Sequence, residues 1–290
     1  MKILEGKVAI VTGASRGIGK MIASGLCANG VKVYISSRKG SALLKTQDEL
    51  INKYNAECIA VPCDLSTQEG IDTLYEKVSA DEKGIDFLIN NAGAVSGNSL
   101  DTFSESDWDN VMDLNVKSVF FLTQKFKSLL KINATFNDPS RVVNIGSVSG
   151  IINPGTETYS YSSSKAAVHH LTRSLAGVLV KENILVNAIA PGPYPSDLLG
   201  PAINYNYGMV EEDYRKMAEQ TVSRKLAVLA GQWRYYSMDA DNNYSTKLPD
   251  TKNRIFYSAE IEDQKKTPDG INYMKKEGNK QVRKTSTPKS

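Results

Sequence analysis

Short runs of hydrophobic residues alternate with longer amphipathic segments from Lys7 to about Pro191. The short runs are continuously apolar, which predicts strands covered on both faces, and the longer segments have the apolar spacing of helices. Strands are predicted at Val8–Val11, Val31–Ser36, Ile59–Val61, Phe87–Asn90, Arg141–Ile145 and Ile184–Ile189, and helices at Gly19–Asn29, Ser41–Tyr54, Glu69–Ser79, Ser106–Leu130 and Ser160–Lys181.

Strands and helices follow one another in turn, which predicts a doubly wound α/β domain with a parallel sheet. The connections between neighbouring strands should be right-handed crossovers. With 290 residues, the chain is long enough for such a domain to bury a substantial core without disulfides or a metal.

The pattern fails near residue 222. Val210–Leu229 has helical spacing, but the sequence after Gly231 is polar, and few apolar residues recur there at either period. We therefore divide the chain into a domain over residues 1–222 and an atypical polar segment over 223–290. Within that segment, residues from about 235 to 290 are predicted to be poorly ordered.

The net charge of +3 is unevenly distributed. Residues 223–290 hold 14 Lys and Arg against 8 Asp and Glu, a charge of +6, and the rest of the chain carries −3. A basic segment can bind nucleic acid, but here acidic residues are interspersed and no aromatic-basic motif of a nucleic-acid module appears. A solvated segment is the better interpretation, and no nucleic-acid partner is expected.

The cysteines and the N-terminus indicate the compartment. Cys27, Cys58 and Cys63 form neither a C-x-x-C pair nor a zinc-ligand spacing, so they are predicted to be buried, reduced and not metal-binding. No signal peptide precedes the first predicted strand, and there is no uninterrupted apolar run of about 18 residues. A cytoplasmic protein with no membrane partner is expected.

The first predicted strand leads into a glycine-rich turn, Thr12–Gly19, which opens a helix. Glycines allow a tight turn and a close approach of the backbone to a phosphate, and the start of a helix offers free N–H groups to it. A strand before and a helix after this turn predict that a dinucleotide pyrophosphate binds here. The candidate cofactor-binding residues are Gly13, Ser15, Arg16, Gly17, Ile18 and Gly19.

Other candidate cofactor residues follow the next strands. Arg38, together with Arg16, suits a 2′-phosphate and favours NADP over NAD, although both could be surface arginines. Asp64, followed by Leu65, is a candidate for the adenine amine, or simply caps the next helix. The small residues of Asn91–Gly93, including Ala92, would let the backbone pack beside the cofactor.

The helix predicted at Ser160–Lys181 begins with Tyr161 and, four residues later, Lys165, which lie on one face. An adjacent ammonium lowers the pKa of a phenol, so that it can act as a general acid or base. Ser147 follows a predicted strand, at the end of the sheet where ligands bind, and its hydroxyl suits a carbonyl oxygen. Asn115 lies inside a predicted helix, where asparagine is a poor helix former.

Together these residues resemble the short-chain dehydrogenase/reductase family over roughly residues 5–200. The matching motifs are Thr12-Gly13-x-x-x-Gly17-x-Gly19, Asn90-Asn91-Ala92-Gly93, Asn115, Ser147, Tyr161-x-x-x-Lys165 and Pro191-Gly192, in the family's order. The resemblance implies a Rossmann fold, a nicotinamide cofactor and a catalytic set of Asn115, Ser147, Tyr161 and Lys165. It also implies that Pro191 and Gly192 line the cofactor.

The family assigns a role to each catalytic residue. By this resemblance, Ser147 orients the substrate carbonyl and Tyr161 gives or takes the proton. Lys165 binds the nicotinamide ribose and lowers the pKa of Tyr161, and Asn115 holds a water that links Lys165 to solvent. The sequence looks most similar to reductases of 3-oxoacyl thioesters, on Thr12–Gly19 and Ala190–Ser196.

Two features depart from the family. The separation of Ser147 and Tyr161 is one residue longer than usual, and we place the extra residue in the loop Asn153–Gly155. Tyr159 lies nearer to Ser147, but it is six residues from Lys165 and off its face. After residue 222, no strand resembling the family's last strand is predicted, which puts a homo-oligomer in doubt.

The leading hypothesis is an NADPH-dependent oxidoreductase that reduces a carbonyl to an alcohol: a 3-oxoacyl group, a ketone or an aldehyde. The alternative is a protein that binds NADPH but is catalytically impaired, because it lacks the usual C-terminal elements. The binding site for the small-molecule substrate would be lined by Ala94–Leu100, Ile151–Thr158 and Tyr194–Tyr207. The apolar residues in the last range favour an acyl chain or a ring ketone.

Overall fold

The computed structural model describes residues 4–153 and 155–192, and the backbone of strands at 227–230, 235–238, 244–245, 271–277 and 280–286. The prediction of poor order therefore falls mostly on residues outside the described ones, and it stays a prediction. Among the described residues, no helix combines the length and apolar character needed to cross a bilayer. Nor does any cluster of three or more potential metal ligands occur among them.

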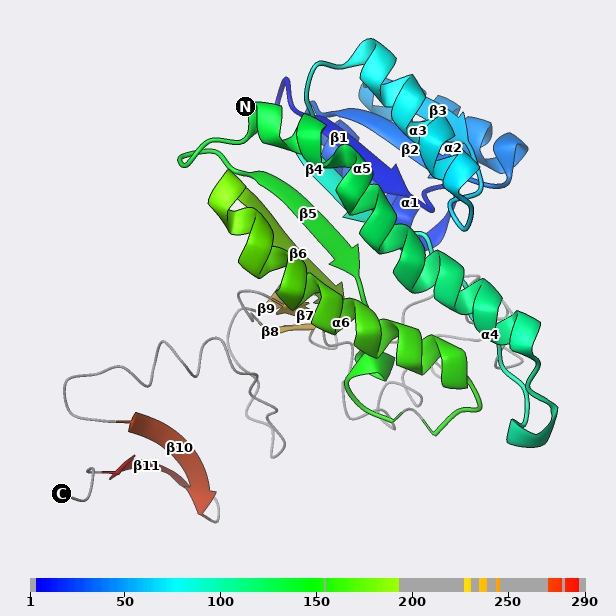
Figure 1. Ribbon diagram of the computed structural model, residues 1–290. Coiled ribbons are helices and arrows are strands. Elements are labelled where there is room, and N and C mark those ends of the chain that lie inside the picture. Colours follow the sequence, from blue (N-terminus) through cyan, green and yellow to red (C-terminus); the bar gives the residue numbers. More distant parts are fainter. Residues whose placement is uncertain are drawn as a thin grey trace.

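The core of the fold is a parallel sheet in the order β3-β2-β1-β4-β5-β6 (Figure 1). Every neighbouring pair among these six strands is parallel. This order, which reverses direction between β1 and β4, confirms the predicted doubly wound Rossmann-type sheet. The strands are β1 (Val8–Thr12), β2 (Lys32–Ser37), β3 (Cys58–Pro62), β4 (Phe87–Asn90), β5 (Ser140–Ile145) and β6 (Ile184–Ala190), each within one residue of its prediction.

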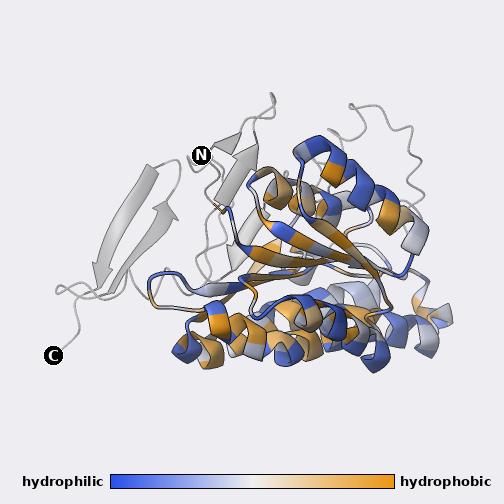
Figure 2. Ribbon diagram, turned by 90° about the horizontal axis from the view of Figure 1, so that it is seen from above, coloured by the Kyte–Doolittle hydropathy of each residue, from blue (hydrophilic) through white to orange (hydrophobic). Residues whose placement is uncertain are grey.

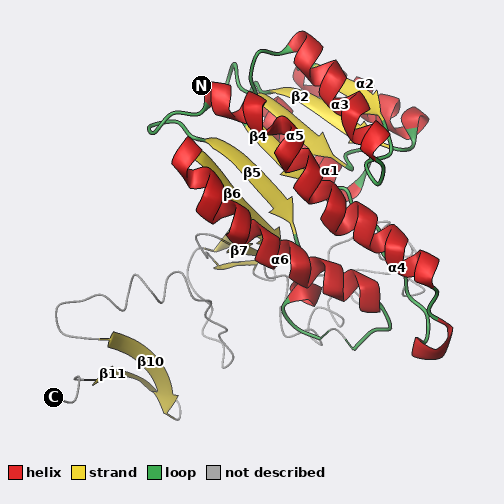
Figure 3. Cartoon of the chain, in the orientation of Figure 1, coloured by secondary structure: helices red, strands yellow, loops and turns green. Residues whose placement is uncertain are grey.

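Helices cover both faces of the sheet, as Figure 3 shows. They are α1 (Gly17–Ala28), α2 (Gly40–Tyr54), α3 (Gln68–Asp81), α4 (Glu105–Met112), α5 (Ser118–Asn133) and α6 (Tyr159–Leu179). Single 3₁₀ turns lie at η1 (Leu100–Thr102), η3 (Val148–Gly150) and η4 (Val180–Glu182).

The helix predicted over Ser106–Leu130 is divided. A π-helical turn, η2 (Asp113–Lys117), separates α4 from α5 and contains Asn115. Such a turn winds an extra residue into the helix and is frequent at functional sites. The cause is tertiary, because the side chain of Asn115 is bound by main-chain groups of Ala94, and helical periodicity does not record such a contact.

Two hydrophobic clusters lie on opposite faces of the sheet. Along β1, Val8 and Ile10 join the cluster formed with α3 and α5, whereas Ala9 and Val11 join the cluster formed with α1 and α2. Because successive side chains of a strand point to opposite faces, a continuous apolar run is what two covered faces require. Figure 2 shows this pattern, with apolar strands between helices of mixed character.

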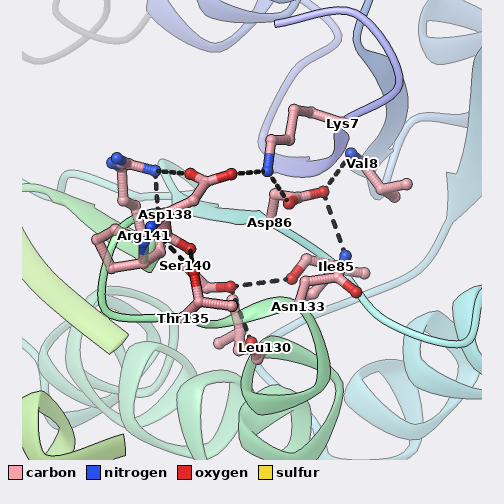
Figure 4. A network of polar contacts seen from close by, with 11 residues as sticks. Lys7, Val8, Ile85, Asp86, Leu130, Asn133, Thr135, Asp138, Ser140 and Arg141 are labelled. Carbon is pink, nitrogen blue, oxygen red and sulfur yellow. Dashed lines mark hydrogen bonds and ion pairs between the residues drawn. The ribbon is translucent and has the colours of Figure 1, made fainter. Parts of the chain in front are cut away.

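A network of ionic and polar contacts joins the amino ends of β1, β4 and β5 (Figure 4). Asp86 is buried and accepts hydrogen bonds from the Val8 amide at 2.8 Å and from Lys7 Nζ at 2.7 Å. Lys7 also pairs with Asp138, which lies 3.5 Å from the guanidinium of Arg141. This network fixes the starts of three central strands.

The sheet continues beyond β6 with antiparallel strands. β7 (Ala227–Ala230) pairs with β6, β8 (Tyr235–Met238) with β7, and β9 (Tyr244–Ser245) with β8. β10 (Ile271–Glu277) and β11 (Lys280–Ser286) form a separate two-stranded sheet. The sequence predicted no strand after residue 222, and the helical interpretation of Val210–Leu229 is wrong where it overlaps β7. Four apolar residues are too few to distinguish a strand from a helix by periodicity.

Candidate active site

The turn from β1 to α1 depends on glycines, either for their backbone angles or for the close approach of neighbouring atoms. Gly13 and Gly17 have φ angles of +65° and +56°, in the left-handed region that favours glycine. A Cβ on Gly19 would lie 2.4 Å from Asn91 Nδ2 and 2.5 Å from the Gly13 carbonyl oxygen. Arg16, at the N-cap of α1, gives no side-chain cap to the helix. The first amides of α1 and this bare backbone thus fit a pyrophosphate.

Side chains tie this turn to the loop that follows β4. Thr12 Oγ1 accepts hydrogen bonds from the amides of Asn91 and Ala92, each at 2.9 Å. Asn91 Nδ2 donates in return to the carbonyl oxygens of Thr12, at 2.8 Å, and Gly13, at 3.2 Å. Thr12 was not among the predicted site residues, although its place directly before the glycines was a signal.

Arg38 and Asp64 lie near each other after β2 and β3. The side chain of Arg38 is 64% exposed, and its Nη1 is 4.0 Å from Asp64 Oδ2. Asp64 Oδ1 accepts hydrogen bonds from the amide and the hydroxyl of Ser66, at 3.0 and 2.8 Å, so it shapes the turn before α3. Leu65 is buried beside it. The other carboxylate oxygen of Asp64 is directed toward Arg38.

Two more predicted cofactor residues support the turn. The Ser15 carbonyl accepts a hydrogen bond from Thr46 of α2, at 2.9 Å, and Ile18 is half-buried in the first turn of α1. At the other end of the crevice, the amide of Val148 donates to the Pro191 carbonyl at 3.1 Å, and Gly192 follows. The ends of β5 and β6 are thereby joined.

Tyr161 and Lys165 are both buried on one face of α6. Lys165 Nζ donates to the Ile145 carbonyl at 2.7 Å and lies 5.6 Å from the centre of the Tyr161 ring. A Cβ on Gly93 would lie 3.7 Å from Lys165 Nζ and 3.3 Å from Asn115 Oδ1. The structure therefore brings the loop after β4, the π-helical turn and α6 together around Lys165.

Ser147 leaves the end of β5 and caps the 3₁₀ turn η3. Its Oγ accepts a hydrogen bond from the amide of Ser149 at 3.1 Å. The Ser147 side chain is close enough to the phenol of Tyr161 to influence its pKa. The prediction that the extra residue between Ser147 and Tyr161 lies in the loop Asn153–Gly155 stays a prediction, because the middle residue of this loop lies outside the described ones.

Asn115 is held by three hydrogen bonds. Its Oδ1 accepts from the Ala94 amide at 2.8 Å, and its Nδ2 donates to the Ala94 carbonyl and to Ser164 Oγ, both at 2.9 Å. Ser164 in turn donates to the Tyr161 carbonyl at 2.7 Å. Ser164 was not predicted as a site residue, because a serine in a helix gives no signal until its partner Asn115 is known.

Two of the three predicted substrate-lining ranges lie among the described residues, and they are in contact. The Asn98 amide donates to the Glu157 carbonyl at 3.2 Å, so the loops of Ala94–Leu100 and Ile151–Thr158 are adjacent. The third range, Tyr194–Tyr207, lies outside the described residues.

Residues 7–204 match the short chain dehydrogenase family. The chain belongs to the short-chain dehydrogenase/reductase family. It is 46% identical, over 193 residues, to the rhamnolipids biosynthesis 3-oxoacyl-[acyl-carrier-protein] reductase of Pseudomonas aeruginosa, covering 67% of this chain and 75% of that protein. As a family member, it is an oxidoreductase that works with a nicotinamide cofactor.

Two solved structures place this short-chain dehydrogenase among nicotinamide-dependent reductases. The RhlG/NADP active-site complex of Pseudomonas aeruginosa superimposes with a TM-score of 0.70 at 40% identity, covering 77% of this chain and 85% of that one. The 3-ketoacyl-(acyl-carrier-protein) reductase of Brucella melitensis, complexed with NADH, superimposes with a TM-score of 0.64 at 27% identity. The match covers 70% of this chain and 82% of that one. One neighbour thus carries NADP and the other NADH.

Burial dominates the electrostatics of this dehydrogenase's crevice. It lowers the pKa of the Lys165 ammonium to about 8. Burial also raises the pKa of the Tyr161 phenol, and the nearby Ser147 side chain opposes this only in part. The pKa of Tyr161 is therefore raised, whereas the charge of Lys165 alone would lower it. The favourable charge of a neighbouring ammonium can be predicted from the sequence, whereas the cost of removing the phenolate from water depends on burial in the folded protein.

Proposed function

We propose that this protein uses NADPH to reduce the carbonyl of a 3-oxoacyl thioester to an alcohol, with Tyr161 as the general acid. The observation that carries the proposal is the buried phenol of Tyr161, which shares one face of α6 with Lys165 and has its ring centre 5.6 Å from Lys165 Nζ. The 3-oxoacyl specificity of the Pseudomonas aeruginosa relative, at 46% identity, supports the choice of substrate.

The proposed cofactor site follows the carboxyl ends of the strands. Gly13, Gly17 and Gly19 would let the pyrophosphate approach the backbone, and the first amides of α1 would bind it. Asn91–Gly93 would pack along the cofactor, and Pro191 and Gly192 would lie at its nicotinamide end. The cofactor supplies the hydride, and the protein supplies position and charge.

Arg38 and Arg16 would distinguish NADPH from NADH. The largely exposed guanidinium of Arg38 has the forked geometry that suits phosphate oxygens, and no carboxylate follows β2 to accept a ribose hydroxyl. We therefore expect Arg38→Ala to weaken NADPH binding while leaving NADH binding nearly unchanged. Fluorescence titration with each nucleotide measures both, and equal losses for the two would contradict the role of Arg38.

Each catalytic side chain has a task in the reducing direction. Ser147 would donate a hydrogen bond to the substrate carbonyl oxygen, because its Oγ already accepts from the Ser149 amide and its proton can point elsewhere. Burial raises the pKa of Tyr161, which keeps its phenol protonated and able to give the proton to the same oxygen. Lys165 would bind the ribose and limit the cost of the phenolate that remains.

Asn115 would keep this arrangement in place. Its hydrogen bonds to Ala94 and Ser164 hold the loop after β4 against α6, next to Lys165. A water relay from Lys165 through Asn115 to solvent remains a prediction from the family resemblance.

The deciding experiment follows oxidation of NADPH with acetoacetyl-coenzyme A, a short 3-oxoacyl thioester, as the substrate. Tyr161→Phe should reduce kcat by about 10²-fold or more, as expected for loss of a general acid, and leave NADPH binding intact. Tyr159→Phe is the matched control, since Tyr159 is two residues away and 36% exposed. Near-normal turnover by Tyr161→Phe would refute the mechanism. NADPH binding by the wild-type protein without turnover of any carbonyl would favour the catalytically impaired alternative.

A further inference from the structure

We propose that His169 is a positioning residue for Ser147, the side chain that holds the substrate carbonyl in the proposed function. The imidazole supports the main chain where β5 ends, and so sets the place of the Ser147 hydroxyl. This inference rests on the proposed role of Ser147, and its test therefore includes a readout that needs no turnover.

The hydrogen bond that His169 makes is with the backbone rather than with another side chain. Its Nε2 accepts a hydrogen bond from the Ser147 amide at 3.4 Å. A Cβ on Gly146 would lie 2.1 Å from Nε2 and 2.5 Å from Cδ2 of the same ring. The imidazole therefore lies directly against the peptide between Gly146 and Ser147, and only glycine fits at residue 146.

The other side of this peptide is held by β6. The Gly146 amide donates to the Ile189 carbonyl at 2.7 Å, and the Val148 amide donates to the Pro191 carbonyl at 3.1 Å. The chain that carries Ser147 is thus bounded by β6 on one side and by His169 on the other. Removal of His169 would leave it fixed on one side alone.

The position of His169 along α6 ties Ser147 to the proton donor. Tyr161, Lys165 and His169 follow one another at intervals of four residues, so they lie along one face of the helix. A single rigid element then carries the phenol, the ammonium and the support of Ser147. The distance between the two hydroxyls that face the substrate is set by α6 rather than by the loop between them.

The chemical form of His169 agrees with this role. The residue is 7% exposed, and burial together with the charges of Lys165 and Arg173 lowers its pKa to about 4. The imidazole is therefore neutral at physiological pH and offers a lone pair at Nε2. A protonated ring would direct N–H against N–H at the Ser147 amide.

Two variants separate positioning from simple filling of space. Leucine at residue 169 fills a similar volume but has no acceptor, whereas glutamine carries an amide oxygen near the place of Nε2. We expect His169→Leu to lower kcat for acetoacetyl-coenzyme A by about tenfold, with the Kd for NADPH unchanged, as a small misplacement of a catalytic group predicts. His169→Gln should recover most of this loss. His170→Leu, one residue along on the exposed side of α6, is the control.

A double-variant cycle with Ser147→Ala gives the sharpest test. If His169 acts through Ser147, His169→Leu will cause little further loss of kcat once the hydroxyl is gone. Independent, multiplicative losses would overturn the proposal. So would an equal loss in the leucine and glutamine variants, since that is the behaviour of a residue that only fills the core.

Hydrogen exchange of the Ser147 amide tests the same contact without catalysis. We expect faster exchange in His169→Leu than in the wild type and in His170→Leu, with similar thermal unfolding of all three proteins. Unchanged exchange would overturn the inference. If exchange responds as expected but the wild-type protein does not turn over acetoacetyl-coenzyme A, the positioning contact stands and the proposed substrate fails.

Discussion

Replacing Lys165 with methionine should stabilise this protein while removing an ammonium from its crevice. Burial lowers the pKa of Lys165 from its ordinary value of 10.5 to about 8. At about 1.4 kcal/mol for each pH unit, the charged form is disfavoured in the folded protein by about 3 kcal/mol. Loss of the hydrogen bond from Nζ to the Ile145 carbonyl offsets about 1–2 kcal/mol of this. Lys165→Met should therefore raise the free energy of unfolding by about 1–2 kcal/mol near pH 7.

The pH dependence of this difference is the more specific expectation. Between pH 8 and 10.5 the unfolded chain keeps the proton on Lys165 and the folded protein releases it. The unfolded state then binds more protons, so this group makes the wild type more stable as pH rises. The advantage of Lys165→Met should shrink by about 2 kcal/mol between about pH 7 and pH 9.5.

Urea unfolding of both proteins across this pH range, without added nucleotide, measures the difference. Lys131→Met is a suitable control, because it also removes an ammonium but the Lys131 side chain is 62% exposed. If Lys165→Met were less stable than the wild type by the same amount at every pH, the pKa of Lys165 would not be lowered in the folded protein, and the reasoning would fail.

Two further predictions concern stability away from the crevice. Asp86→Ala should lower the free energy of unfolding, measured by urea titration, by about 3–5 kcal/mol. The reason is that the Lys7 ammonium and the Val8 amide lose their buried partner. A loss below about 1 kcal/mol would show that water replaces the carboxylate. Gly70→Ala places a Cβ 1.9 Å from the Asp64 carbonyl and should lower the melting temperature by several degrees. Gly25→Ala, with open space around it in α1, should raise it slightly; the same sign for both would contradict the packing argument.

The six parallel strands could be predicted from the sequence because each is a continuous apolar run that ends at polar or glycine residues. The antiparallel strands could not. β10 and β11 pair several polar residues with one another, Lys276 with Gln281 for example, and leave no apolar period in the sequence. The π-helical turn at Asp113–Lys117 was equally hidden, since it depends on the contacts of Asn115 with Ala94, a residue that is distant in sequence.

The candidate site shows the same division. Ser147, Tyr161 and Lys165 stand at spacings that a single sequence displays, and the structure brings them together. His169 was missed because a histidine on the apolar face of a helix resembles any core residue until its partner, a backbone amide, is known. The direction of the Tyr161 pKa was also missed, because burial is a property of the folded protein that a motif does not contain.

The ionic network around Asp86 and the crevice around Tyr161 stand at opposite ends of the same strands. A strand such as β5, with six residues, separates them by about 20 Å. Substitutions at one end are therefore expected to combine additively with substitutions at the other. Substitutions that stabilise the amino ends of the strands should therefore let the protein accept destabilising substitutions in the loops around Tyr161, including those that change its carbonyl substrate.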